Sequence, residues 1–220
     1  MKSADEISIP SKKAFRLLPE KVAQFVLAKV GDFSRRLVEQ KANPNLITII
    51  GLVFGLLAGA FFAWGKPLVA ALAIFFCGFF DILDGKVAER ANRRSLFGAI
   101  FDSSLDRYSE FFIYLGLAYY FRNHWALWLI FFTLLGSLMV SYTRARAEGL
   151  GMAGNIGLMQ RAERMILLLA GAVVGKIIAN LTATMVVGLS IITVASHITA
   201  WQRIFFVRQQ ERAKSQRKEV

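Results

Sequence analysis

The sequence predicts an all-α integral membrane protein with six transmembrane helices and an N-terminal amphipathic helix at the membrane interface. Three observations support this fold class. Of the 220 residues, 55% are hydrophobic, and the apolar residues form runs of roughly 20, the length that crosses a bilayer. Short polar turns separate these runs. The segment before the first run instead has apolar residues at helical spacing among lysines and arginines, as in a helix lying on a membrane surface.

The chain divides into three parts. Residues 1–42 form the cytoplasmic or interfacial helix, expected over about 12–40, although a soluble helix packed on a partner has the same pattern. Residues 43–207 are expected to form the six-helix transmembrane domain, and residues 208–220 a basic cytoplasmic tail that is a solvated helix. The six spans are expected at about 46–64, 68–89, 97–120, 125–143, from 157 to a turn at 176–180, and 181–207.

Two local patterns support the first span. Asn43 precedes Pro44, which predicts a helix that is capped by Asn43 and begins at the proline. Gly51, Gly55 and Gly59 follow at intervals of four residues. This spacing predicts that another helix approaches the first span closely, because glycine leaves the backbone uncovered.

The charge distribution predicts the partners and the orientation. The formal net charge is +12, and the basic residues flank apolar runs, so anionic lipid headgroups are expected as partners and nucleic acid is not. Only three of the 27 basic residues, Lys66, Arg122 and Lys176, fall in the odd-numbered turns. The positive-inside bias then places both chain ends and the end of the second span on the cytoplasmic side of the cell membrane.

Four aspartates stand out because they lie in or just after the second apolar run. A charged side chain inside a membrane is costly, so each is a functional hypothesis. Asp81 and Asp84 are three residues apart, and Asp102 and Asp106 are four apart, so each pair shares one helix face. Converging carboxylates repel one another unless cations neutralise them. Oxygen ligands without His or Cys favour Mg²⁺, Mn²⁺ or Ca²⁺.

The spacing of these aspartates is more specific than their composition. It resembles the signature of the CDP-alcohol phosphotransferases, integral membrane enzymes that make phospholipids. Seven positions match over 26 residues, namely Asp81, Asp84, Gly85, Ala88, Gly98, Asp102 and Asp106. One position differs, since the family has an arginine directly after the alanine and this chain has Glu89 followed by Arg90. Either Arg90 supplies that cation from the next position or the contact to the nucleotide is lost.

The resemblance implies a reaction and roles for individual residues. An alcohol attacks the lipid-side phosphate of a CDP-linked lipid, such as CDP-diacylglycerol, and CMP is released. Asp81, Asp84 and Asp102 are then metal ligands, and Asp106 is both a ligand and the proton acceptor, with two Mg²⁺ or Mn²⁺ ions as cofactors. The resemblance also implies a homodimer. The residues expected near the nucleotide are Asn45, Thr48, Gly85, Ala88, Glu89, Arg90, Ser95 and Gly98.

The acceptor is predicted from two further segments. Residues 141–148 and 161–164 resemble the branch that uses inositol 1-phosphate, the phosphatidylinositol-phosphate and archaetidylinositol-phosphate synthases. Ser141, Arg144, Arg161 and Arg164 are the expected acceptor-phosphate residues, because three guanidinium groups at one cavity would repel one another without an anion. The alternative is that these arginines only set the topology.

Two other functional interpretations remain open at this point. Glycerol 3-phosphate, serine or another alcohol is the alternative acceptor for the same chemistry. A divalent-cation or proton-coupled transporter would also place carboxylates inside spans. However, transporter sites usually lie near the midplane among broken helices, whereas these aspartates cluster toward one face.

Overall fold

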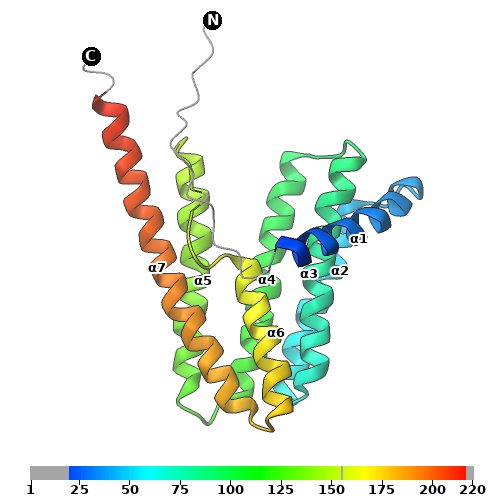
Figure 1. The fold of residues 1–220 in the computed structure, drawn as a ribbon, viewed down its shortest axis with the longest axis vertical. Helices are drawn as coiled ribbons and strands as arrows, with labels where there is room; N and C mark the ends of the chain where they lie inside the picture. Colours follow the sequence, from blue (N-terminus) through cyan, green and yellow to red (C-terminus); the bar gives the residue numbers. More distant parts are fainter. Residues whose placement is uncertain (1–19, 155, 217–220) are drawn as a thin grey trace, which may run out of the picture.

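The computed structural model describes residues 20–154 and 156–216. These residues form seven α-helices and no strand (Figure 1), which confirms the all-α fold class. The helices are α1 (Glu20–Glu39), α2 (Pro44–Ala63), α3 (Pro67–Arg90), α4 (Leu96–Tyr120), α5 (Ala126–Gly149), α6 (Arg161–Ile177) and α7 (Leu181–Gln216).

Four of the helices in the described part of the chain, α2, α3, α5 and α7, are long and apolar enough to cross a membrane. The two other helices of the bundle differ in composition. α4 carries Asp102, Asp106 and Glu110, and α6 carries Arg161 and Arg164 in its first turn. α4 and α6 therefore bring charged side chains into the bundle, as the end of α3 does with Asp81 and Asp84.

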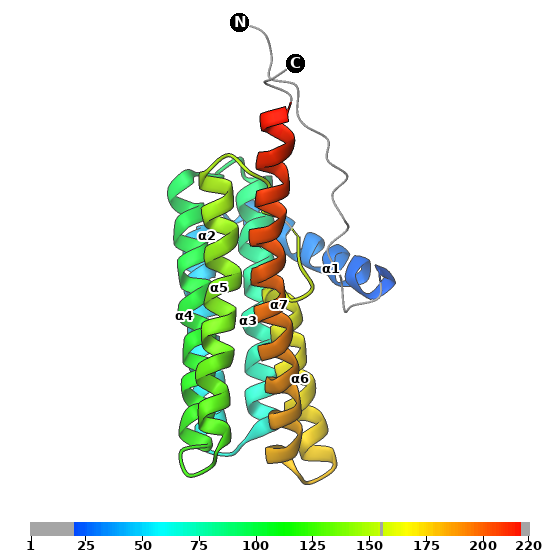
Figure 2. The same ribbon diagram turned by 90° about the vertical axis from the view of Figure 1, so that its left-hand side faces the viewer.

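The bundle has two different ends. Helices α2 to α7 run roughly along one direction, with the α2–α3, α4–α5 and α6–α7 turns at one end (Figures 1 and 2). The α3–α4 turn and the C-terminal parts of α5 and α7 lie at the other end. α6 begins part-way along the bundle, below the end of α5. The aspartates of α3 and α4 consequently lie toward the end that holds the α3–α4 turn.

The start of α2 confirms the predicted cap. The Asn43 side chain accepts a hydrogen bond of 3.0 Å from the Asn45 backbone amide, and Pro44 is the first residue of the helix. Close approach at glycine is confirmed as well, with α4 as the partner. A Cβ on Gly59 would lie 2.2 Å from the Phe112 carbonyl oxygen, and one on Gly55 would lie 2.6 Å from the Ser109 Cβ. These glycines let α2 pack directly on the backbone of α4.

The N-terminal helix lies across the bundle rather than along it (Figure 2). α1 passes through Gly31 without a break, and the expected residues 12–19 fall outside the described residues. Its Val30 is buried in a small apolar cluster with Leu83 and Val87 of α3. The Arg90 side chain at the end of α3 donates to the Gly31 carbonyl and, at 2.9 Å, to the Ser34 hydroxyl. Apolar packing and two hydrogen bonds thus join α1 to α3.

One helix boundary differs from the sequence-based expectation. α6 begins at Arg161 and not near residue 157, because the Leu158 and Met159 amides donate to the Thr199 hydroxyl of α7 at 3.1 and 3.0 Å. These hydrogen bonds hold the preceding segment in a non-helical course against α7. α7 continues without interruption past residue 207 to Gln216, in agreement with the helical tail that the sequence predicts. Arg208, Arg212 and Lys214 therefore lie on a continuation of the last helix.

Candidate active site

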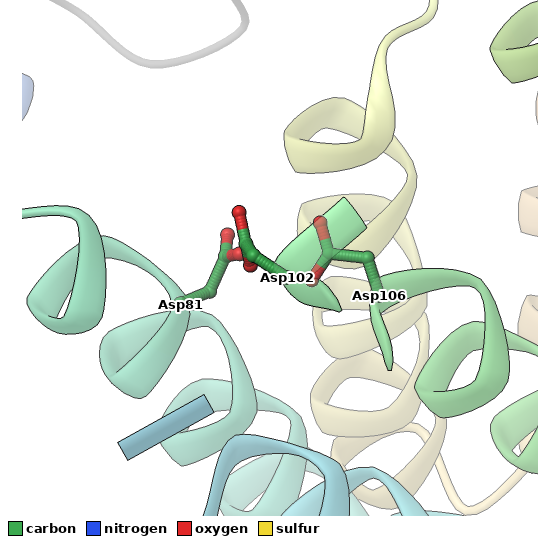
Figure 3. A group of neighbouring side chains, drawn as sticks. All are labelled: Asp81, Asp102 and Asp106. Atoms are coloured by element: carbon green, nitrogen blue, oxygen red, sulfur yellow. The ribbon is translucent and has the colours of Figure 1, made fainter. Parts of the chain in front are cut away.

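Three of the four aspartates form one cluster between α3 and α4. Asp81, Asp102 and Asp106 each offer a carboxylate oxygen, and these oxygens lie within 4.8 Å of one another. Figure 3 shows Asp81 projecting from α3 toward Asp102, with Asp106 one turn further along α4 and α6 passing behind them. The spacing of four residues puts Asp102 and Asp106 on one face of α4, as the sequence predicts.

Asp84 lies outside this group of three but borders the same region. Its side chain is 4% exposed. One oxygen of Asp84 (Oδ2) and one of Asp102 (Oδ1) are buried without a hydrogen-bond partner in the described part of the chain. Buried carboxylate oxygens are nearly always paired. Since the donors are all carboxylate oxygens, the residues present fit a hard divalent cation such as Mg²⁺ or Mn²⁺.

Two cavities adjoin the aspartates. The smaller one holds only about 10 Å³ and is bordered by Asp81, Asp84, Asp106, Ser109 and Arg161, among others. The larger one, about 470 Å³, opens among the start of α2, the end of α3 and the start of α4. A volume of this order suits a small-molecule site. It is lined by Pro44, Asn45, Thr48, Asp81, Ile82, Asp84, Gly85, Lys86, Ala88, Glu89, Arg93, Arg94, Ser95, Gly98, Ala99 and Asp102.

Seven of the eight residues predicted near a nucleotide line this larger cavity, and Arg90 is the exception. The Arg90 guanidinium turns toward α1, where it binds the Gly31 carbonyl and the Ser34 hydroxyl. Arg90 therefore does not give this cavity the positive charge that an arginine in place of Glu89 would give it in the family pattern. Basic side chains at the rim come instead from Lys86, Arg93 and Arg94.

Glu89 organises part of this basic rim. Its carboxylate lies 3.3 Å from the Lys86 ammonium and 3.4 Å from the Arg94 guanidinium. Neither Lys86 nor Arg94 is among the residues that the sequence predicts near the nucleotide. The signal for Lys86 was its place three residues before Glu89, which puts both side chains on one face of α3.

The two signature glycines have different surroundings. A Cβ on Gly85 would meet nothing within 4 Å, so this residue leaves open space at the cavity. A Cβ on Gly98 would lie 3.1 Å from the Ser95 Oγ. That same Oγ accepts a hydrogen bond of 2.9 Å from the Gly98 amide and caps α4. Ser95 and Gly98 thus fix the start of the helix that carries Asp102 and Asp106.

Arg161, predicted to bind an acceptor phosphate, lies among the aspartates. Its Nη1 is 2.8 Å from the Asp81 Oδ1 and 2.7 Å from the Asp106 Oδ1. Its Nη2 donates to the Ser109 hydroxyl at 3.0 Å. The first residue of α6 therefore joins α3 and α4 through the carboxylates that are suited to hold metal.

Arg164 and Arg144 also have carboxylate partners. The Arg164 side chain is 1% exposed and forms a forked pair with Glu110, with distances of 2.5 and 2.8 Å. Arg144 pairs with Glu148 at 2.8 Å in an exposed position. The sequence-based argument that these arginines need a bound anion to offset their charge is therefore wrong for this structure, because each already has a carboxylate partner. Their assignment to an acceptor phosphate, together with half-buried Ser141, stays a prediction.

Arg203 is a residue that the sequence interpretation missed. It is 2% exposed and donates to the Ile156 carbonyl at 2.8 Å and to the Val140 carbonyl. No carboxylate of the described residues lies within ion-pair distance of it. An arginine in the sixth apolar run was the signal that could have identified it. Its hydrogen bonds tie α7 to α5 and to the segment before α6.

A carboxylate cluster inside a bundle of apolar helices, next to a cavity with a basic rim, is the arrangement of a membrane enzyme that uses metal ions to act on phosphate-bearing substrates. The family model described as CDP-alcohol phosphatidyltransferase matches residues 41–207. The chain belongs to this family of membrane phosphotransferases.

Curated relatives and solved structures that are similar to this chain include inositol-phosphate lipid synthases. An archaetidylinositol phosphate synthase of Methanothermobacter thermautotrophicus is 36% identical over 165 residues, which cover 75% of this chain and 83% of that protein. A phosphatidylinositol phosphate synthase of Mycobacterium tuberculosis is 33% identical over 181 residues, covering 79% and 83%. The crystal structure of the M. tuberculosis synthase with CDP-DAG bound matches with a TM-score of 0.74 at 30% identity, covering 81% of this chain and 92% of that one. A structure of the same synthase with manganese and citrate has the same TM-score and identity and covers 81% and 88%.

Proposed function

We propose that this chain transfers a phosphatidyl-type group from a CDP-linked lipid to inositol 1-phosphate and releases CMP. The observation that carries the proposal is the group of Asp81, Asp102 and Asp106, of which Asp81 and Asp102 line the 470 Å³ cavity. The relatives named as inositol-phosphate lipid synthases support this acceptor. The CDP-DAG in the related crystal structure supports the donor class.

Asp81, Asp84, Asp102 and Asp106 would hold two Mg²⁺ or Mn²⁺ ions, consistent with the manganese in the related synthase. Bound there, the ions supply charge neutralisation for the donor pyrophosphate and for the departing CMP. Asp106 accepts the proton of the acceptor hydroxyl, because a carboxylate in hydrogen-bond reach is a competent general base. Direct attack of the alcohol on the lipid-side phosphate needs no covalent enzyme intermediate.

The larger cavity is the proposed site of the CDP group. Asn45 and Thr48 of α2 and Gly85 and Gly98 at its sides are proposed to border the nucleotide. Lys86, Arg93 and Arg94 supply positive charge at the rim, where a diphosphate needs it. Arg90 supports the site from outside by holding α1 against α3.

The proposed acceptor site uses fewer arginines than the sequence suggested. Ser141, Arg144 and Arg161 are the groups proposed to bind the phosphate of the acceptor. Arg164 is enclosed with Glu110, so its proposed part is to hold the start of α6 in place. Arg161 is now paired with Asp81 and Asp106, and it would reach an acceptor phosphate only after leaving them.

The proposed setting is a cell membrane crossed six times, by α2 to α7, with both chain ends and the aspartates on the cytoplasmic side. The bias of basic residues away from the odd-numbered turns supports this orientation. α1, within residues 1–42, is proposed to lie at the interface, and residues 208–220 to face the cytoplasm. A homodimer completes the proposal and rests on the family resemblance.

The test is release of CMP from CDP-diacylglycerol by the purified protein with Mg²⁺ and a panel of acceptors. Inositol 1-phosphate should be the preferred acceptor over inositol, glycerol 3-phosphate and serine. Asp84→Asn serves as the inactive control, because an amide is a far poorer ligand for a hard divalent ion. Preference for glycerol 3-phosphate or serine would overturn the acceptor, and normal turnover by Asp84→Asn would overturn the metal site.

A further inference from the structure

Arg161 contacts the aspartate cluster through a single shared nitrogen. Its Nη1 lies 2.8 Å from the Asp81 Oδ1 and 2.7 Å from the Asp106 Oδ1, so it bridges one carboxylate of α3 and one of α4. The Nη2 reaches the Ser109 hydroxyl at 3.0 Å and lies 3.9 Å from the Cys77 sulfur. The side chain is 19% exposed. This guanidinium is therefore placed within the carboxylate cluster and not beside it.

Arg161 pairs with carboxylates that a metal ion at this site would need as ligands. Asp81 and Asp106 would hold a divalent ion through their carboxylate oxygens, which Mg²⁺ binds at about 2.0–2.1 Å. The Arg161 Nη1 already pairs with one oxygen of each carboxylate. Two cations repel each other at such short range, so a guanidinium and a divalent ion compete for this pair of oxygens.

We propose that Arg161 is an internal counter-cation of the metal site, which occupies Asp81 and Asp106 and which a divalent ion displaces from them. The inference rests on the metal site of the proposed function. In the metal-free site Arg161 is a positioning residue, since it acts there through the two aspartates. Before exchange it keeps them together in a partly enclosed site, and after exchange its guanidinium is free at the start of α6.

The rest of α6 has contacts of its own that do not depend on the pairing of Arg161 with the aspartates. One turn later the buried Arg164 remains paired with Glu110 of α4 at 2.5 and 2.8 Å. The helix start is held separately, since the Glu163 carboxylate accepts a hydrogen bond of 3.1 Å from the Gln160 amide and the Gln160 side chain accepts one in return. Displacement of Arg161 consequently needs a side-chain movement and no undocking of α6.

The exchange has a consequence for Asp106. While Arg161 binds the Asp106 Oδ1, that oxygen is occupied and its charge is offset. Release of Arg161 frees it to bind metal or to accept a proton. The same step frees a guanidinium for an anion near the cluster. Metal loading and completion of the acceptor site are thereby coupled by one arginine.

The main experiment measures Mn²⁺ affinity of the purified protein without substrates, with free Mn²⁺ followed by electron paramagnetic resonance. Arg161→Gln should bind Mn²⁺ at least about tenfold more tightly than wild type, because a competing positive charge is gone. Arg161→Lys keeps the charge and should stay near wild type. Arg122→Gln, which removes the same charge in the α4–α5 turn at the opposite end of the bundle, should be unchanged. Equal or weaker binding by Arg161→Gln would overturn the proposal.

A second measurement needs no neutral variant, in case Arg161→Gln does not fold. In wild type labelled with ¹⁵N-arginine, the Arg161 side-chain signal is identified by its loss in Arg161→Lys. It should shift as Mg²⁺ is added, while the Arg164 signal stays in place. An Arg161 signal that does not move at saturating Mg²⁺ would overturn the exchange. Neither measurement involves donor or acceptor, so its failure leaves the proposed transfer reaction standing, and failed CMP release with normal exchange would count against the reaction alone.

Discussion

Two carboxylate–guanidinium ion pairs, one helical turn apart, join α4 to α6. They differ in burial and in the side chains around them. The site pair is Asp106 with Arg161, and the buried pair is Glu110 with Arg164. The acids are four residues apart on α4 and the arginines three apart on α6, so the two pairs are stacked. Asp106 and Arg161 are 17% and 19% exposed, whereas Glu110 and Arg164 are 5% and 1% exposed.

The surroundings of the two pairs explain what each does. The Tyr114 hydroxyl lies 3.3 Å from Glu110 and 3.3 Å from the Ser137 hydroxyl, so the buried pair belongs to an enclosed polar network. The site pair instead shares its arginine with Asp81 and lies beside Asp102. One positive charge there faces several carboxylates. An excess of negative charge next to a cavity, and not proximity alone, distinguishes an exchangeable functional pair from a structural one.

The largest expected effect comes from breaking the site pair on its acidic side. Asp106→Asn should lower the rate of CMP release by roughly 10³-fold, because the variant loses both a general base and an anionic ligand. The fold should persist, since Arg161 keeps Asp81 as a partner. The measurement is the initial rate at saturating donor, together with the midpoint of thermal unfolding in detergent. A variant that retains a tenth of the wild-type rate would contradict the role assigned to Asp106.

Breaking the buried pair should have the opposite profile. Glu110→Gln leaves the Arg164 charge enclosed without an anion, and the free energy of unfolding should fall by about 3–5 kcal/mol. Unfolding should be followed by denaturant titration in detergent. Mn²⁺ affinity, measured on the folded fraction at low temperature, should stay near wild type. A full-stability Glu110→Gln, or one whose main defect is in Mn²⁺ binding, would show that the two pairs are not separate in function.

The sequence predicted the four aspartates of the site, but it did not predict which carboxylates pair with Arg161 and Arg164. The intervals between Asp81, Asp84, Asp102 and Asp106 are local, and helix geometry converts them directly into shared faces. Which carboxylate meets Arg161 or Arg164 depends instead on the register between α4 and α6, which lie about 50 residues apart along the chain. No local pattern carries that register, so the arginines were assigned to an anion rather than to aspartate and glutamate.

The same distinction applies to the fold. The Asn43 cap, the Pro44 start and the small residues of α2 are local signals, and each is found as expected. The start of α6 and the direction of Arg90 depend on remote partners, namely Thr199 of α7 and the Gly31 and Ser34 groups of α1. Contacts of this kind are decided by tertiary packing, which is why sequence spacing missed them.

A third acid–arginine pair, Arg144 with Glu148 on α5, gives the smallest expected effect and tests whether burial explains the difference between the other two. Its distance of 2.8 Å is close to the 2.7 Å of the site pair, but its side chains are 45% and 50% exposed. Exposed pairs at this helical spacing contribute about 0.3–0.5 kcal/mol, because water already solvates both charges. Glu148→Gln should therefore change the free energy of unfolding by no more than that amount, measured beside Glu110→Gln under identical conditions. If Glu148→Gln and Glu110→Gln instead lost similar stability, burial would not explain the difference between the two pairs, and the structural role assigned to the buried pair would be wrong.

Glu148→Gln also releases Arg144 from its carboxylate partner. The KM of this variant for a phosphate-bearing acceptor should therefore fall or stay constant. A rise in that KM would remove Arg144 from the proposed acceptor site.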